Sequence, residues 1–517
     1  MSVAELLRAR AASAPGSVAI AGDGRQLSFG ELDRAANRVA NQLIAAGVQR
    51  GDRIAFIDRN GSEYWEVFLG ALKAGAVLVP LNFRLSATEI DWSLTDCDAK
   101  LVVAGASYAA AVQPSGRPLV VITAAGPDYA ERVGDEPDYA EWVAAGADDD
   151  PGRDAVGAEY IELIYSSGTT GRPKGVLVSA GQQLWSVDAF GSCFDVDAES
   201  RSLVPVPYYH VAGGGWALIT LSRGGRIIQS REPTADSMLH QLVEHRVTHT
   251  AMVPAVMQIL TQSSQAAAAD FSALRQVVYG ASPISESLLK ASVALFGAQL
   301  FQSYGLSETM GVTTLLGAEE HRLDGDLSKL RSAGRAVPGI ELRVLDVETG
   351  QALAPGTAGE IAVRGPSVTP GYWHNPEANA AAFTADGFFR TGDMGRLDED
   401  GYLYILDRIK DMIVTGGENV YPAEVESVLA AHPAVADVAV VGVPSSKWGE
   451  TPLAFVVATS PELDPSDVIA FARRHLAHFK CPTEVRLVAE LPRNASGKIL
   501  KRQLRAPFWA GQSRQVG

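Results

Sequence analysis

A loop rich in small and hydroxyl-bearing residues, SSGTTGRPKG, occupies positions 166–175 and follows the strand-like segment YIELIY. Glycines let backbone N–H groups approach an anion, Ser and Thr hydroxyls donate further hydrogen bonds, and a lysine adds positive charge. The run therefore predicts a phosphate-binding loop, although a flexible polar loop is the ordinary explanation of shorter stretches with this composition. It is not a Walker A motif, which ends in Gly-Lys-Ser/Thr, because Pro173 precedes Lys174 and Gly175 follows it.

Further motifs follow this loop in order along the rest of the chain. They are YGAS (279–282), YGLSET (304–309), SAGRAVPGIE (332–341), GEIAVRGPSVTPGYW (359–373), FRTGD (389–393), LDRIKDMIVTGGENVYPAEVE (406–426) and LPRNASGKILKR (491–502). Together with the loop, they resemble the signature motifs of the adenylate-forming superfamily, which contains acyl-CoA and aryl-CoA synthetases, peptide-synthetase adenylation domains and beetle luciferases. So many motifs in register leave little room for coincidence.

The resemblance implies a reaction in two steps. A substrate carboxylate attacks the α-phosphate of ATP to give an acyl-adenylate and pyrophosphate, and the thiol of coenzyme A then displaces AMP from the carbonyl carbon. ATP, Mg2+ and coenzyme A as co-substrate are therefore implied. Such an enzyme must hold two anions together and stabilise charge on a pentavalent phosphate, which explains the cationic and hydrogen-bonding residue types in the motifs.

The resemblance also assigns an ATP site. The residues implied for the β- and γ-phosphates are Ser166, Ser167, Gly168, Thr169, Thr170, Gly171 and Lys174. Those implied for adenine and its surroundings are Gly280, Ala281, Ser282, Tyr304 and Gly305, with the Tyr304 ring stacked on the base. Asp393 would accept the ribose hydroxyls with the help of Arg408. A core tyrosine and a turn aspartate are the alternatives for Tyr304 and Asp393.

Four residues are implied to be catalytic, namely Lys498, Glu308, Thr309 and His210, and the first three act on the reacting groups of the first step. Glu308 would coordinate Mg2+, a hard cation that prefers carboxylate and phosphate oxygens, and Thr309 would lie beside the α-phosphate. Lys498 would bridge the substrate carboxylate and the α-phosphate as negative charge builds. A surface carboxylate is the alternative for Glu308. The neighbouring Lys501 and Arg502 are expected to be solvated.

The second step requires a thiol to reach the carbonyl that Lys498 had covered. In the family, the small C-terminal domain turns about a hinge residue, which is Lys410 here, and brings the segment VTGGENVYP towards the cleft. Gly417 would leave room for the pantetheine arm of coenzyme A. Trp448 resembles a tryptophan that contacts coenzyme A in some aryl-CoA ligases, and a packing aromatic is its alternative. Cys481 stands where related ligases carry a basic residue, so contacts to the CoA nucleotide stay unassigned.

The segment PVPYYHVAGGGWALI (205–219) contains no carboxylate that could pair with a substrate ammonium. We therefore predict a carboxylic acid without a free α-amino group, and the choice among fatty, aryl and bulky cyclic acids stays open. The predicted acyl pocket contains His210, Gly214, Gly215 and Gly280, with His210 between the pocket and the nucleotide. A buried structural histidine is the alternative for His210, and a helix start packed against a strand is the alternative for the glycine run.

The elements that position these motifs follow from hydrophobic spacing. Residues 28–48 have apolar side chains at helical spacing, and Ser28 and Glu31 have the spacing of a capping box. Strand-like segments at 53–57 and 77–80 flank a helical one, which is the βαβ rhythm of a parallel sheet. Short alternating strands at 342–401 predict a β-rich subdomain. We expect an α/β protein with a large N-terminal domain, 1–407, made of doubly wound α/β subdomains and a β-barrel-like subdomain, followed by a small mobile α+β domain, 408–517.

Composition limits the remaining possibilities. The chain has 517 residues and a formal net charge of -16, which argues against a nucleic acid or an anionic membrane as the main partner. Three widely spaced cysteines suggest no disulfide framework, and no apolar run is long enough to span a membrane, so we expect a cytoplasmic protein. Competing hypotheses are an adenylation enzyme that loads an acyl-carrier protein, a luciferase-like oxidase and a non-catalytic nucleotide-binding homologue. A homodimer is also compatible with the sequence.

Overall fold

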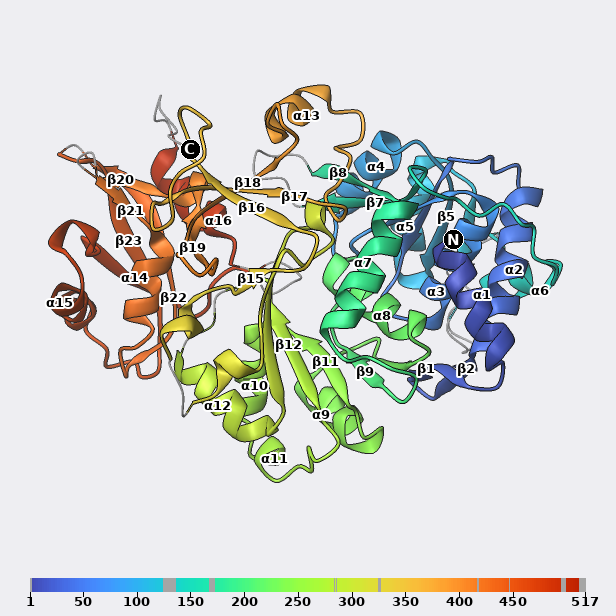
Figure 1. Ribbon diagram of the computed structural model, residues 1–517, viewed down its shortest axis with the longest axis horizontal. Coiled ribbons are helices and arrows are strands. Elements are labelled where there is room, and N and C mark those ends of the chain that lie inside the picture. The colour runs from blue at the N-terminus through green and yellow to red at the C-terminus, as the bar shows by residue number, and fades with distance from the viewer. Residues whose placement is uncertain are drawn as a thin grey trace.

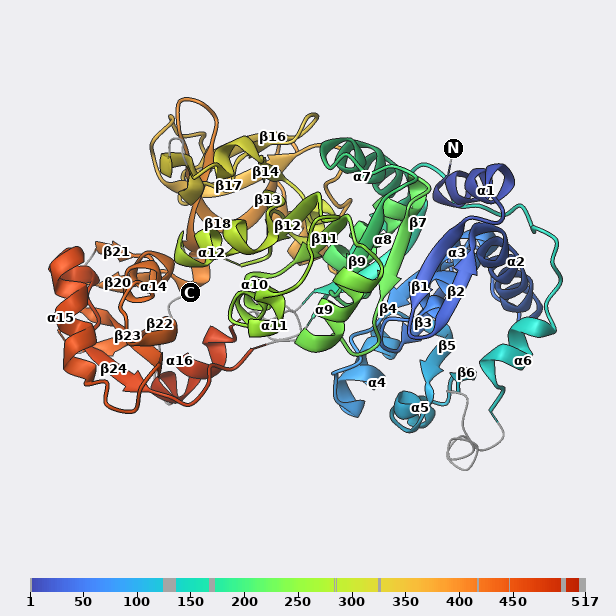
Figure 2. The same ribbon diagram turned by 90° about the horizontal axis from the view of Figure 1, so that it is seen from below.

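The protein, here a computed structural model, is described over residues 2–123, 136–166, 173–282, 284, 286–323, 327–415, 418–445, 447–493 and 499–510. Within these residues the strands form sheets of nine, six, four and five strands. Figure 1 shows the first half of the chain at the right and the segment after residue 410 at the left, and Figure 2 gives the same separation from below. The architecture is the α/β class predicted from the sequence.

Two sheets with mostly parallel strands build the first half of the chain, and helices cover them. The nine-stranded sheet of the described residues has the order β15-β14-β13-β12-β11-β9-β10-β1-β2. Its strands are β1 (Val18–Gly22), β2 (Arg25–Ser28), β9 (Arg201–Val204), β10 (Arg226–Gln229), β11 (His249–Met252), β12 (Gln276–Gly280), β13 (Gln299–Tyr304), β14 (Thr314–Leu316) and β15 (Arg335–Ala336).

The six-stranded sheet of the described part has the order β6-β5-β3-β4-β7-β8. Its strands are β3 (Arg53–Ile57), β4 (Val77–Pro80), β5 (Ala99–Gly105), β6 (Leu119–Ile122), β7 (Tyr160–Ser166) and β8 (Lys174–Ser179). The expected strands at 53–57 and 77–80 are confirmed as β3 and β4, which pair in parallel. Strand β8 runs antiparallel to β7, so the two strands flank the loop predicted to bind phosphate.

Helix α1 (Val3–Ser13) precedes the first strand, and the other helices of this part of the chain lie between successive strands. These are α2 (Phe29–Ala45), α3 (Ser62–Ala74), α4 (Ala87–Asp96), α5 (Ala106–Val112), α6 (Tyr139–Ala144), α7 (Ala180–Cys193), α8 (Val211–Ser222), α9 (Ala235–Glu244), α10 (Pro254–Thr261), α11 (Ser264–Ala267) and α12 (Glu286–Phe296). Helix α2 begins with the predicted capping box, in which the Ser28 hydroxyl accepts a bond from the Glu31 backbone N–H and the Glu31 carboxylate accepts one from the Ser28 backbone N–H.

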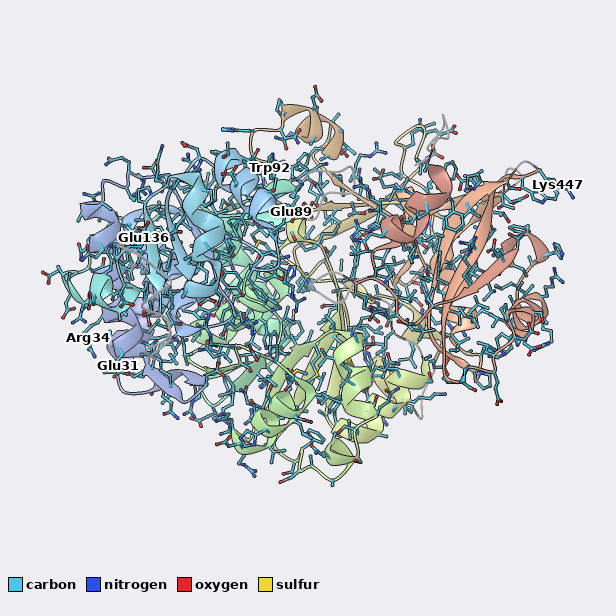
Figure 3. The ribbon with its side chains drawn as sticks, turned by 180° about the vertical axis from the view of Figure 1, so that it is seen from behind. Glu31, Arg34, Glu89, Trp92, Glu136 and Lys447 are labelled. Carbon is cyan, nitrogen blue, oxygen red and sulfur yellow. The ribbon has the colours of Figure 1, made fainter. Side chains whose placement is uncertain are left out.

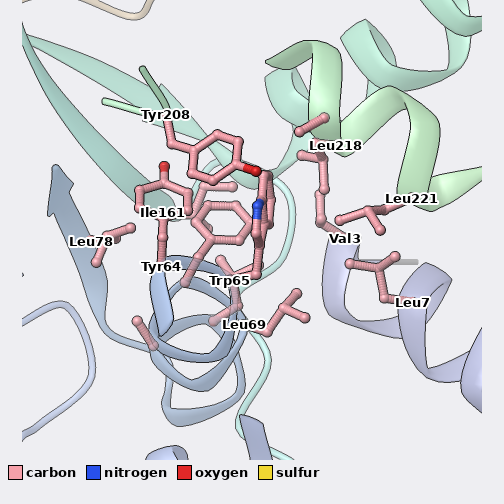
Figure 4. Close-up of a cluster of buried hydrophobic side chains, with 14 of the residues drawn as sticks. Val3, Leu7, Tyr64, Trp65, Leu69, Leu78, Ile161, Tyr208, Leu218 and Leu221 are labelled. Carbon is pink, nitrogen blue, oxygen red and sulfur yellow. The ribbon is translucent and has the colours of Figure 1, made fainter. Parts of the chain in front are cut away.

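The core of the large domain holds aromatic side chains from α3 and from the segment before α8. The rings of Tyr64 and Trp65 lie 5.1 and 5.3 Å from the ring of Tyr208, centre to centre. Figure 4 shows this group between β-strands on one side and the apolar faces of α1 and α8 on the other. The segment that leads into α8 is thus fixed by packing, because aromatic rings bury large apolar areas.

Two sheets with mainly antiparallel strands build the second half, and in the last of them β24 pairs in parallel with β23. The β-rich subdomain predicted at 342–401 is confirmed as β16 (Glu341–Leu345), β17 (Gly359–Arg364), β18 (Phe389–Leu397) and β19 (Leu403–Arg408), with α13 (Pro376–Ala382) beside it. The last sheet contains β20 (Ile413–Thr415), β21 (Glu418–Val420), β22 (Val435–Ser445), β23 (Gly449–Ala458) and β24 (Glu484–Leu487), with α14 (Pro422–Leu429), α15 (Pro465–His475) and α16 (Lys501–Trp509).

Lys410 lies in the short 3-10 helix η6 (Ile409–Asp411), between β19 of one sheet and β20 of the next. Strand β19 pairs with β18 up to Arg408, and the Arg505 guanidinium of α16 donates to the Lys410 carbonyl at 3.0 Å. The division of the chain into 1–407 and 408–517 stays a prediction. Among the described residues, no helix is both long and apolar enough to cross a membrane.

The expectation that Lys501 is solvated is wrong. Its side chain is only 17% exposed, and its ammonium lies 2.8 Å from a carboxylate oxygen of Glu426 on α14. Burial alone would lower the pKa of Lys501, but the combined attraction of Glu426 and Asp407 outweighs burial and raises the pKa to about 12. The first residue of α16 therefore ties that helix to the body of the small domain, whereas Arg502 is exposed as expected.

Candidate active site

Asp393 lies where β13 meets the β18–β19 pair, and two side chains hold its carboxylate. The Tyr304 hydroxyl donates to one oxygen at 2.7 Å, and the Arg408 Nε lies 2.5 Å from the other. Strands β18 and β19 place Asp393 directly opposite Arg408 in register. Burial alone would lower the pKa of Arg408, but attraction to Asp393, Tyr304 and Glu308 outweighs it, so the guanidinium stays charged.

Glu308 lies beside this group, in the short 3-10 helix η3 (Ser307–Thr309) that follows β13. The Tyr372 hydroxyl donates to its Oε1 at 2.9 Å, and the Lys174 ammonium lies 4.7 Å from the centre of the Tyr372 ring. The backbone N–H of Thr369 donates to the Glu308 carbonyl at 2.7 Å. The fold thus brings the carboxylate predicted for the metal and the lysine predicted for the phosphates to opposite parts of one tyrosine.

The segments predicted to face adenine have tight backbones. A Cβ added to Gly280 would lie 2.2 Å from the Ser303 carbonyl oxygen, and one added to Gly305 would lie 2.5 Å from Gly311. Ala281 adopts a positive φ of 65°, which is uncommon for a residue with a side chain and points to a constrained site. Ser282 follows it in a bend.

Thr309 is fully buried, and its hydroxyl has partners within the protein. The hydroxyl accepts a bond from the Leu306 backbone N–H at 3.0 Å and another from the Thr313 hydroxyl at 2.9 Å. These bonds fix the turn that carries Glu308. The predicted place of Thr309 beside the α-phosphate stays a prediction.

His210 is the N-cap of α8, and its ring centre lies 4.3 Å from that of Tyr209. Burial, with a smaller effect of Arg84, lowers the pKa of His210 to about 4, so the imidazole is neutral at pH 7. Its Nε2 and the Tyr209 hydroxyl are buried and have no hydrogen-bond partner in the part of the chain that the structure describes. Such unpaired groups are rare in protein interiors and offer contacts to a bound molecule.

The three glycines after His210 have different surroundings. A Cβ on Gly213 would lie 2.3 Å from the Pro207 carbonyl oxygen, and one on Gly214 would lie 2.8 Å from that of Tyr208. A Cβ on Gly215 would meet nothing within 4 Å. The first two glycines therefore fit the alternative of a helix start packed against its neighbour, and Gly215 alone borders open space.

Seven of the predicted site residues lie outside the described residues: Ser167, Gly168, Thr169, Thr170, Gly171, Gly417 and Lys498. Ser166 ends β7, and its hydroxyl donates to the Lys174 carbonyl at 3.3 Å, so both ends of the phosphate loop are held together.

The residues predicted for coenzyme A lie in two different environments. Trp448 is 46% exposed, so it does not pack as a core aromatic, and the Lys447 ammonium lies 4.5 Å from its ring centre. Figure 3 places Lys447 at the outer edge of the small domain. Cys481 is 5% exposed within the core of that domain, which removes it as a surface contact. The role of Trp448 stays a prediction.

Sequence reasoning missed two residues that hold the site. Tyr372 stands in a motif recognised from the sequence, but its bond to Glu308 becomes visible only in the fold. Asn60 follows β3; its amide donates to the Val206 carbonyl at 3.1 Å, and its amide oxygen accepts from the Tyr208 N–H at 2.9 Å. It thereby fixes the segment before His210, and no local signal in the sequence indicates this contact.

Glu308 is the carboxylate predicted to hold Mg2+. In the described residues, no group of three or more His, Cys, Asp or Glu side chains could hold a metal alone. Glu308 has one carboxylate oxygen bonded to Tyr372, and no partner for the other appears in the described ranges. Mg2+ is commonly held by one or two carboxylates together with substrate phosphates and water, so a single carboxylate beside a phosphate lysine fits.

The fold and these side chains define an adenylate-forming enzyme. Residues 7–373 match the family model of AMP-binding enzymes, and residues 424–498 match the C-terminal domain of the same enzymes. The chain belongs to the AMP-binding enzyme family, within the adenylate-forming superfamily predicted from its motifs.

Curated relatives and solved structures align with this protein over nearly the whole chain. The fatty acid–[acyl-carrier-protein] ligase ScoC of Streptomyces coeruleorubidus is 37% identical over 97% of this chain and 95% of its own. The long-chain-fatty-acid–CoA ligase FadD13 of Mycobacterium tuberculosis is 36% identical over 94% of each chain. The crystal structure of ATP-bound MatB from Rhodopseudomonas palustris superposes with a TM-score of 0.89 at 32% identity, covering 98% of this chain and 99% of that one. The protein is an AMP-forming acid–CoA ligase by class.

Proposed function

We propose that this protein activates a carboxylic acid without a free α-amino group as an acyl-adenylate and transfers the acyl group to coenzyme A, with the motif residues in the roles given below. The observation that carries the proposal is the meeting of five separate motifs. Tyr304 and Arg408 hold Asp393, while Glu308 and Lys174 meet at Tyr372.

The nucleotide would bind across this meeting point. Asp393 is a carboxylate held by two donors, so its remaining lone pairs can accept the two ribose hydroxyls of ATP. The glycines at 280 and 305, which leave no room for side chains, provide flat backbone for adenine beside Tyr304. Lys174, together with Ser166 and residues 167–171, would hold the β- and γ-phosphates.

Glu308 would hold Mg2+ through its carboxylate. When bound, Mg2+ supplies positive charge that neutralises the phosphate oxygens. Lys498 would donate to the substrate carboxylate and the α-phosphate, and Thr309 would line the same place. These groups stabilise charge that develops during transfer of the adenylyl group, which is where fixed donors lower a barrier most.

The acid would enter beside α8. Gly215 borders open space, and the neutral His210 and the Tyr209 hydroxyl present buried polar atoms without partners in the described residues. Gly280, the last residue of β12, lies against Ser303 of β13 and would form the side of the acyl pocket that faces adenine. Fatty acids are the first candidates, because ScoC and FadD13 are both named for them.

The second half-reaction would follow a turn of the small domain about Lys410. Gly417 and Trp448 would then meet coenzyme A, whose thiol displaces AMP. A carrier-protein thiol is a second acceptor that one observation favours, since ScoC is named an acyl-carrier-protein ligase. We further propose that the enzyme acts in the cytoplasm; a homodimer stays a prediction.

Product analysis tests the proposal. Purified protein with ATP and Mg2+ would receive a panel of fatty, aryl, cyclic and amino acids, and AMP and thioester would be measured with and without coenzyme A. We expect acid-dependent AMP and a CoA thioester, and neither from Asp393→Ala protein, the matched control for contaminating ligases. No AMP with any acid would exclude the proposed activity, whereas AMP without a CoA thioester would favour the carrier-protein acceptor.

A further inference from the structure

Tyr372 has no role in the chemistry derived so far, yet two groups assigned to ATP and its metal converge on it. Its hydroxyl donates to Glu308 Oε1 at 2.9 Å, and its ring face lies 4.7 Å from the Lys174 ammonium. The side chain is 7% exposed, so neither contact is an incidental surface one. A hydrogen bond to a carboxylate and a cation over an aromatic face are both directional interactions.

The backbone of Tyr372 is held on both sides. Its N–H donates to the Asn379 side-chain oxygen at 2.6 Å, and the Asn379 amide donates back to the Tyr372 carbonyl at 3.1 Å. The close fit continues at Gly371, whose φ is 145° and where an added Cβ would lie 2.8 Å from Asn379. The ring therefore projects from a rigid segment.

The same segment joins the two elements that carry Lys174 and Glu308. The Trp373 N–H donates to the Gly175 carbonyl at 2.8 Å, and the Leu177 N–H donates to the Gly371 carbonyl at 3.1 Å, so the segment is attached to β8. On its other side, the Thr369 N–H donates to the Glu308 carbonyl. The backbone brings β8 and η3 together, and Tyr372 is the side chain that spans them.

We propose that Tyr372 is a positioning residue: its hydroxyl orients the Glu308 carboxylate and its ring holds the Lys174 ammonium, so that ATP and its metal meet a pre-set pair of opposite charges. The inference rests on the proposed metal role of Glu308. The hydroxyl and the ring of Tyr372 have separate effects, because the hydroxyl acts on the Glu308 carboxylate and the ring acts on the Lys174 ammonium.

A matched control exists in the β-rich subdomain. The Tyr402 hydroxyl donates to Glu320 Oε1 at 2.9 Å, the Lys329 ammonium lies 4.3 Å from its ring centre, and the side chain is also 7% exposed. Tyr402 thus repeats the carboxylate–tyrosine–lysine arrangement without any residue assigned to ATP. Removing its hydroxyl measures the general effect of such a change on the fold.

The test measures ATP binding to each variant by calorimetry, once in the presence of Mg2+ and once in EDTA. The thermal unfolding of each variant is measured alongside. Tyr372→Phe is expected to weaken MgATP binding by about tenfold, the usual effect of losing a bond to a charged group, and to leave binding in EDTA unchanged. Tyr372→Leu, which also removes the ring from Lys174, is expected to weaken binding in both conditions. Tyr402→Phe is expected to bind as the unchanged protein does.

A double variant separates the inference from its premise. Glu308→Gln should itself weaken MgATP binding, and adding Tyr372→Phe to it should cause no further loss. Unchanged binding by Glu308→Gln would overturn the metal assignment. A loss in Glu308→Gln with none in Tyr372→Phe, additive losses in the double variant, or equal losses in Tyr372→Phe and Tyr402→Phe would overturn the role of Tyr372 alone.

Discussion

Gly214 and Gly215 are neighbours in sequence, but only Gly214 packs closely against another part of the backbone. Gly214 approaches the Tyr208 carbonyl so closely that a methyl group would lie 2.8 Å from it, whereas Gly215 borders open space. Both residues lie in α8, where glycine is less favourable than alanine by about 1 kcal/mol. The first glycine is needed for packing, and the second keeps volume free beside the predicted acyl site.

Substitution should separate these two uses. Gly215→Leu is expected to leave the melting temperature unchanged or higher, and to reduce kcat/KM for long or bulky acids by about tenfold or more while sparing short acids, since it fills the open space. Gly214→Ala is expected to destabilise the protein by about 1–3 kcal/mol for every substrate alike. Equal activity of Gly215→Leu on short and long acids would place the acyl pocket elsewhere.

At the scale of the element, β7 contains a buried carboxyl group at its centre. Glu162 is 7% exposed, and its bond from the Tyr64 hydroxyl, at 3.3 Å, is long. Burial raises the pKa of Glu162, and the bond from Tyr64 opposes this with a smaller effect, so the pKa is about 7. The strand that leads into the predicted phosphate loop therefore carries a carboxyl group that resists ionisation.

The raised pKa of Glu162 makes the protein less stable as pH rises. The unfolded chain releases this proton near pH 4.5 and the folded chain near pH 7, so Glu162 reduces stability progressively across that interval. Glu162→Gln should raise the free energy of unfolding by up to about 3 kcal/mol at pH 8 and by little at pH 4. Chemical denaturation at both pH values measures the difference.

Glu159, just before the same strand, provides a control of opposite sign. The Arg50 guanidinium and the Val156 N–H hold its pKa at about 2. Its carboxylate thus contributes stability above pH 4.5 that is lost as pH falls towards 2, and Glu159→Gln should not stabilise the protein at pH 8. A gain for Glu162→Gln that is independent of pH would show that packing, rather than charge, limits this position.

Much of the element level was predictable because local chemistry specifies it. The capping box at Ser28 and the apolar face of 28–48 encode α2 directly, and the family resemblance of the motifs assigned Asp393, Glu308 and Lys174 to one predicted site. The ion pair of Lys501 with Glu426 was not predictable, since it joins α16 to a helix 75 residues earlier in the chain. Tyr372, Asn60 and Glu162 were missed for the same reason: their partners are distant in sequence.

At the scale of the molecule, Arg408, which is predicted to assist at the ribose, and the predicted hinge Lys410 stand two positions apart. Arg408 ends β19 and holds Asp393, while the Lys410 carbonyl accepts a bond from Arg505 of α16. Lys498 precedes α16 by three positions in the sequence, whereas Arg408 and Asp393 both precede Lys410. In the proposed turn about Lys410, Lys498 would therefore move while the bond between Arg408 and Asp393 stays in place.

This arrangement predicts that one substitution affects the two half-reactions unequally. Lys498→Ala should reduce acid-dependent pyrophosphate exchange by about 100-fold or more, because a charge that stabilises the transition state is removed. Thioester formation from a supplied acyl-adenylate should change little, since the proposed turn of the small domain takes the lysine out of the site before the thiol arrives. Arg502→Ala, an exposed cation four residues on, is the matched control and should retain both activities. Equal loss of both half-reactions in Lys498→Ala would mean that the small domain keeps a single orientation throughout the reaction.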